Sequence, residues 1–88
     1  MNKQRRTDLA KAINLLQEIE AKWDEAKEII EQAASEERDG FENLTDGLQA
    51  SERGQRMDEA ASALEEVHSD LDNVDLASMI GQIETASE

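Results

Sequence analysis

The apolar residues in the first half of the chain recur at helical spacing. From Leu9 to Ala33 they follow alternating steps of three and four residues without a miss. This heptad pattern places apolar side chains on one stripe of an α-helix. The stripe consists of Leu9, Ala12, Leu16, Ile19, Trp23, Ala26, Ile30 and Ala33. Ile13 and Ile29 widen it, which indicates packing against more than one neighbour. We predict a helix over residues 7–39, with Thr7 as its N-cap.

The second half of the chain repeats this spacing. Its stripe consists of Met57, Ala60, Leu64, Val67, Leu71 and Val74. Ser51 is a suitable N-cap, so we predict a second helix over residues 51–72. After Val74 the apolar phase changes to Leu76, Ile80 and Ile83. Either the second helix kinks there, or Asn73 or Asp75 caps a separate third helix over residues 75–86, and we favour the separate helix.

Residues 40–50 interrupt both stripes and form the predicted connector. Two of the four glycines lie there, together with Phe41, Leu44 and Leu48, so we expect an ordered turn that covers one end of a bundle. Two matched stripes joined by a short connector predict an all-α, coiled-coil-like antiparallel helical hairpin that forms a single domain over residues 1–88.

The predicted hairpin is too small to bury a thick core. A chain of 88 residues buries only a modest share of its surface, so we expect a dimeric or larger helical bundle. The predicted oligomer seam consists of Leu9, Leu16, Ile19, Trp23, Ile30, Met57, Leu64, Val67 and Leu71.

Composition supports the helical interpretation and narrows the class of protein. Proline and cysteine are absent and the aromatic residues are Trp23 and Phe41, which disfavours strands and excludes a disulfide framework. No apolar run exceeds two residues, so we expect no membrane span. The basic N-terminus has no apolar segment behind it, so we expect a cytoplasmic protein.

Charge is the most unusual property of the sequence. Twenty-two acidic and nine basic residues give a net charge of −13, and no lysine or arginine follows Arg56. Binding to a nucleic-acid backbone requires clustered cations, so we expect no direct nucleic-acid ligand and instead a basic surface on a partner protein. The candidate acidic face consists of Glu52, Asp58, Glu59, Glu65, Glu66, Asp70 and Asp72. The alternatives are a solvated face that confers solubility, or adaptation to high salt.

Candidate chemistry is sparse. His68 is the only histidine; it lies near Asp70 and Asp72, but the second helix supplies no further histidine to complete a site. The acidic segment 70–75 resembles a calcium loop superficially, but Val74 and Asp75 occupy the third-ligand and glycine positions. We predict no metal, no cofactor and no catalytic site. Arg53 and Arg56 are expected to form internal ion pairs with acids of either helix.

The connector carries a motif. Residues Phe41-Glu42-Asn43-Leu44 and Leu48-Gln49-Ala50-Ser51-Glu52-Arg53-Gly54 resemble a pattern found in small, largely uncharacterised acidic helical proteins of phages and bacteria. The resemblance covers about 14 residues, and Thr45 stands where that pattern has a proline. It implies a mobile-element origin and no catalytic activity, and it assigns no functional residue.

The sequence therefore predicts a non-enzymatic acidic protein that presents carboxylates to a basic partner. In its most specific form it is a phage-type inhibitor that imitates nucleic-acid charge and occupies a host defence enzyme in the host cytoplasm. The alternative is a structural homo-oligomerisation module with no charge-specific partner. An enzyme is the least favoured class, because a thin helical pair offers no pocket that would perturb paired carboxylates.

Overall fold

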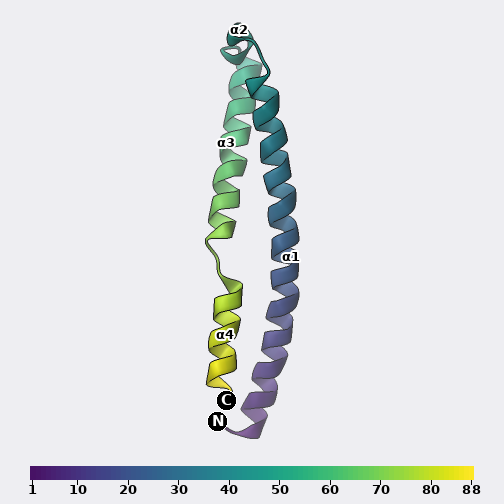
Figure 1. The fold of residues 1–88 in the computed structure, drawn as a ribbon, viewed down its shortest axis with the longest axis vertical. Helices are drawn as coiled ribbons and strands as arrows, with labels where there is room; N and C mark the ends of the chain where they lie inside the picture. Colours follow the sequence, from purple (N-terminus) through teal and green to yellow (C-terminus); the bar gives the residue numbers. More distant parts are fainter. The chain divides into compact units, whose positions relative to one another are not determined.

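The chain is helical throughout, with no strand. A computed structural model describes residues 1–88 and contains α1 (Lys3–Glu42), α2 (Asp46–Gln49), α3 (Glu52–Asp72) and α4 (Leu76–Ala86) (Figure 1). The predicted all-α class is confirmed. None of the four helices combines the length and apolarity that crossing a bilayer requires.

The start of α1 differs from the prediction. The Asn2 side-chain oxygen accepts a hydrogen bond from the Arg5 backbone N–H at 2.8 Å, as an N-cap does. The Thr7 hydroxyl donates to the Lys3 carbonyl at 3.1 Å, which is a bond made inside a helix. The prediction of Thr7 as the cap was therefore wrong, because Asn2 provides a cap five residues before the position at which the apolar stripe predicted the helix to begin.

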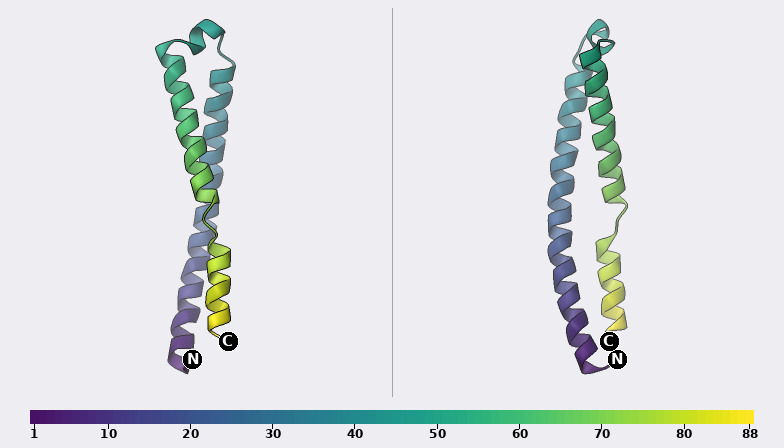
Figure 2. Two further views of the ribbon diagram at one scale, coloured as in Figure 1. Left: turned by 90° about the vertical axis from the view of Figure 1, so that its left-hand side faces the viewer. Right: turned by 180° about the vertical axis from the view of Figure 1, so that it is seen from behind.

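The connector contains a short helix. The Thr45 hydroxyl accepts from the Leu48 backbone N–H at 3.4 Å and begins α2. Ser51 then caps α3 by accepting from the Gly54 N–H at 3.2 Å. Figure 2 shows α2 between the ends of α1 and α3. The predicted connector is thus ordered. It begins later than predicted, because α1 extends through Gly40 to Glu42.

α3 and α4 are separate helices. Asn73 ends α3, and the Asp75 carboxylate accepts from the Ser78 backbone N–H at 3.0 Å to begin α4. The break between them is visible in Figure 1. Of the two arrangements that the sequence left open, the structure has the separate helix with Asp75 as its cap.

Tertiary contacts divide the chain into two compact units. Unit 1 comprises Met1–Glu25 and Val74–Glu88. Its most buried side chain is Ile80 of α4, with 6% of its surface exposed, and Leu76 and Ile83 flank it half-buried. The Arg6 guanidinium donates to the Glu88 backbone carbonyl at 3.3 Å. The inner face of α4 follows the apolar phase that the sequence showed after residue 74.

Unit 2 comprises residues Ala26–Asn73, which include the C-terminal part of α1, α2 and α3. Three polar contacts join α1 to α3 in reverse order along the chain. Two are the ion pairs of Lys27 with Asp72 and of Arg38 with Asp58, and between them the His68 ring nitrogen approaches the Glu31 carboxylate. The fully packed side chains are small. Ala61 is 0% exposed and Ala34 is 5% exposed. Alanine at these positions lets the helix backbones approach closely, so the core of this unit is thin.

The packed stripe of unit 2 is displaced from the apolar stripe of the sequence. On α3 the covered positions are Gly54, Met57, Asp58, Ala61, Leu64, His68 and Leu71. Ala60 and Val67, which the heptad pattern placed on the stripe, are exposed. On α1, Ala34 is buried and Ala33 is exposed. Relative to the predicted stripe, every second packed position is therefore shifted by one residue toward the C-terminus. The shifted positions include His68 on α3 and Lys27 on α1, and each of them lies near an acid of the opposite helix.

Candidate functional site: the carboxylates of α3

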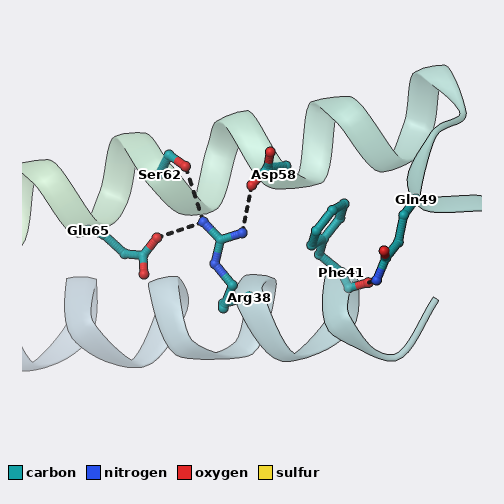
Figure 3. A network of polar contacts seen from close by, with 6 residues as sticks. All are labelled: Arg38, Phe41, Gln49, Asp58, Ser62 and Glu65. Atoms are coloured by element: carbon teal, nitrogen blue, oxygen red, sulfur yellow. Dashed lines mark hydrogen bonds and ion pairs between the residues drawn. The ribbon is translucent and has the colours of Figure 1, made fainter. Parts of the chain in front are cut away.

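Arg38 organises the polar side of unit 2. Its guanidinium donates to Asp58 at 2.6 Å, to Glu65 at 2.7 Å and to the Ser62 hydroxyl at 3.1 Å, all of them on α3 (Figure 3). The same guanidinium lies 5.8 Å from the centre of the Phe41 ring. A planar guanidinium with several donors suits such a divided contact, because one side chain can hold two turns of the opposite helix.

The charge of Arg38 is insensitive to pH. The hydrogen bond to Asp58, then that to Glu65, raises the pKa of Arg38 above its ordinary value. Since the pKa is raised in the folded state, this stabilisation is fully present below the ordinary pKa of arginine and is lost only as pH rises through the raised value. The guanidinium therefore stays charged at neutral pH.

Two further basic residues pair with acids of α3. Lys27 lies 3.2 Å from Asp72, and Arg56 lies 2.5 Å from Glu52 one helical turn away. Of the seven acids predicted to face a partner, four are thus engaged within the chain: Glu52, Asp58, Glu65 and Asp72. The sequence did not identify Arg38 as the principal clamp, because its partners lie 20 and 27 residues away along the chain.

Three of the predicted acids face solvent without an internal partner. Glu59, Glu66 and Asp70 are exposed, and no hydrogen bond or ion pair engages their side chains. Their spacings of seven and four residues place them on one side of α3, roughly 10 Å and roughly 6 Å apart by helical rise. These three residues, the free acidic row, are the part of the predicted face that remains available to an external cation.

A shallow hollow of about 280 Å³ lies on the polar side of unit 2. It is lined by Glu31, Ala34, Ser35, Arg38, Asp39, Glu65 and His68. The His68 ring nitrogen is 3.7 Å from the Glu31 carboxylate, which is longer than a hydrogen bond. No group of three or more histidine, cysteine or acidic side chains is placed to hold a metal ion. The arrangement offers charge pairing and shows no nucleophile held against a base.

The predicted oligomer seam is divided by the structure. Ile19 and Val67 are 47% and 44% exposed and lie off the packed stripes. The other seven are half-buried: Leu9, Leu16, Trp23, Ile30, Met57, Leu64 and Leu71. The seam residues therefore contribute to packing within one chain, and their role in an oligomer stays a prediction.

The connector motif has a structural role. The Gln49 side-chain amide donates to the Phe41 carbonyl at 3.2 Å, and Ser51 caps α3. A Cβ placed on Gly54 would overlap the Leu48 carbonyl oxygen. These contacts explain the residue types of Gln49, Ser51 and Gly54 through the fold, without a ligand. Comparison of the chain with known protein families, with curated proteins and with solved structures finds no match, so membership of the phage and bacterial group that the motif resembles stays a prediction.

Proposed function

We propose that the protein is a non-enzymatic acidic binding protein whose α3 presents carboxylates to a basic surface of a partner protein. The architecture proposed for this role is an antiparallel helical hairpin, formed by α1 against α3 and α4, that assembles as a dimeric or larger coiled-coil-like bundle. The reverse order of the polar contacts between α1 and α3 along the chain supports this arrangement.

The free acidic row carries the proposal. Glu59, Glu66 and Asp70 remain unpaired while Arg38, Lys27 and Arg56 neutralise the neighbouring acids. Carboxylates on a rigid helix keep fixed spacing, which favours a partner whose cations have matching spacing. The net charge of −13 further steers basic partners toward the chain and disfavours nucleic acid as a direct ligand.

The most specific form of the proposal is imitation of nucleic-acid charge. An inhibitor of this kind occupies the groove of a nucleic-acid-binding enzyme, such as a host defence nuclease in the host cytoplasm, and needs neither a cofactor nor a membrane. Phosphates recur about every 3.4 Å along one DNA strand, so carboxylates roughly 6 to 10 Å apart match every second or third phosphate.

The test is competition with DNA for a basic nuclease. We expect the wild-type protein to displace DNA at low salt and the Glu59→Lys, Glu66→Lys, Asp70→Lys triple variant to lose this competition. Glu84→Lys, which changes an exposed acid of α4, is the single-reversal control and should compete as wild type does. Competition that survives the triple reversal, or that is insensitive to salt, contradicts the proposal.

A second candidate function is homo-oligomerisation without a charge-specific partner. It is favoured by the small amount of apolar burial within one chain, where only Ala34, Ala61 and Ile80 are buried hydrophobic residues. Several large apolar side chains are exposed instead: Met1, Leu15, Ile19, Ile29, Leu48, Val67, Val74 and Met79. A second copy that covers some of them supplies the apolar area that a chain of this size lacks.

A further inference from the structure

One side of α3 in unit 2 is left uncovered by the chain. Five exposed residues follow one another along it at helical spacing: Arg56, Ala60, Ala63, Val67 and Asp70. Steps of four, three, four and three residues keep them on a single stripe, here called the α3 outer stripe. Val67 at 44% exposure is its largest apolar side chain.

The opposite flank of α3 is already occupied. Asp58, Ser62 and Glu65 lie on that flank and hold Arg38 of α1. A partner helix at that flank would have to displace this network. The α3 outer stripe has no such contact to α1, and the only interaction made by its residues is the ion pair of Arg56 with Glu52. That pair is exposed, with 74% and 80% of the two side chains accessible. Arg56 can therefore exchange Glu52 for another acid at little cost in free energy.

The stripe is complementary to itself when reversed. It has a cation at its N-terminal end, an acid at its C-terminal end, and Ala63 at its centre. Two copies of α3 related by a two-fold axis at Ala63 would place Arg56 of each copy beside Asp70 of the other. Ala60 and Val67 of the two copies would then alternate across the centre, and alanine would permit close approach of the helices. A symmetric contact of this kind uses the same surface patch on both subunits.

We infer that the α3 outer stripe is the contact through which the protein dimerises, with the two α3 helices antiparallel and Ala63 at the two-fold axis. This inference rests on the second candidate function and names its surface. It places Glu59 of one copy within one residue's rise, about 1.5 Å, of the level of Glu66 of the other, so these glutamates of both copies follow one rim while Asp70 pairs with Arg56. These like charges oppose association, and salt therefore strengthens the dimer by screening them.

The test is sedimentation equilibrium of the full-length chain, with circular dichroism to verify that each variant remains helical. We expect wild-type protein to form a dimer, and Ala63→Glu to weaken dimerisation by at least about tenfold because it places two like charges at the axis. Ser69→Glu is the matched control, because Ser69 is exposed on α3 off the stripe. It adds the same charge and should leave the dimer intact.

A charge exchange tests the orientation of the two helices. Arg56→Glu and Asp70→Arg should each weaken the dimer, and the double variant should restore it because the two ends are again opposite in sign. A parallel pair of helices would not show this rescue, since each residue would then face its own copy.

Three outcomes overturn the inference, and they separate it from the proposals above. A wild-type monomer at all concentrations removes both this contact and the second candidate function. A dimer that persists in Ala63→Glu but dissociates in Ile29→Glu keeps oligomerisation and assigns it to α1, where Ile29 is 64% exposed. Failure of the double exchange to restore a dimer weakened by the single changes rejects the antiparallel arrangement.

Discussion

Gly54 is the residue at which α3 approaches the connector most closely. A Cβ at this position would overlap the Leu48 carbonyl oxygen and lie 2.5 Å from that of Gln49. Both are backbone atoms, which cannot rotate away as a side chain can. Glycine is therefore required here by space, and its backbone angles are those that any residue adopts.

We predict that Gly54→Ala destabilises the protein by about 1 to 3 kcal/mol, because the start of α3 or the α2 turn must move to admit the methyl group. Thermal or urea unfolding followed by circular dichroism measures this change. Gly81→Ala is the control, since nothing lies within 4 Å of a Cβ there and the residue is inside α4. It should stabilise the protein by up to about 1 kcal/mol through helix propensity. Equal and favourable effects of both changes would show that the close approach at Gly54 is absent.

Residue types that act locally could be predicted from the sequence, whereas distant partners could not. Ser51 was predicted as a cap, and Asp75 as one of two candidate caps beside Asn73, because a cap is made with a backbone N–H three residues away. Arg38 was not recognised as the main clamp of α3, because many acids of similar spacing were available. Which acids face Arg38 depends on the rotation of α3 about its axis, and in the structure these acids are Asp58 and Glu65.

At the scale of elements, the periodicity of apolar residues predicted that the three longer segments exist and are helical. It did not predict how each helix is rotated about its own axis. The sequence contains alanine at both 60 and 61 and at both 33 and 34, so at these positions the apolar pattern fits either of two neighbouring stripes. The structure uses Ala34 and Ala61. Polar residues make the difference, because His68 and Lys27 reach acids across the helix pair, and a count of apolar residues gives these contacts no weight.

The short helix α2 was also missed, for a different reason. Four residues are too few to show a period, and the signals that the structure uses are the Thr45 cap and the hydrogen bond from Gln49 to the Phe41 carbonyl. The sequence predicted an ordered connector from its apolar residues, and the cap residue Thr45 was read only as a departure from the motif.

α4 offers a direct measure of how much unit 1 depends on its small core. We predict that Ile80→Ala destabilises the protein by about 2 to 5 kcal/mol, because Ile80 is 6% exposed and its removal leaves a cavity. Met79→Ala is the matched control on the same helix, where the side chain is 44% exposed, and it should cost well under half as much. Chemical denaturation reports both values. Similar losses for the two variants would mean that α4 does not pack through the Ile80 face.

For the whole molecule, the free energy of folding is a balance between little apolar burial and strong charge repulsion. Three buried hydrophobic residues support a chain with a net charge of −13. The ion pairs of Arg38 and Lys27 reduce repulsion between α1 and α3 in unit 2. Most of the remaining acids are exposed, and they occur on all four helices, so their mutual repulsion acts through solvent and is open to screening.

Salt should therefore stabilise this protein, the opposite of the behaviour of a fold that depends on surface ion pairs. We predict that raising sodium chloride from about 20 mM to about 500 mM, which shortens the screening length from roughly 20 Å to roughly 4 Å, raises the melting temperature by at least about 4 °C. The reason is numerical: acids exceed bases by 22 to 9, so screening removes more repulsion than attraction.

Sodium sulfate acts also by surface exclusion, so sodium chloride is the salt to use, and sucrose at equal osmolality is the control for exclusion. Measuring the effect over a range of protein concentrations separates folding from dimerisation, because only the latter depends on concentration. A melting temperature that falls with salt at every concentration would show that the ion pairs of Arg38 and Lys27 outweigh the repulsion among the unpaired acids.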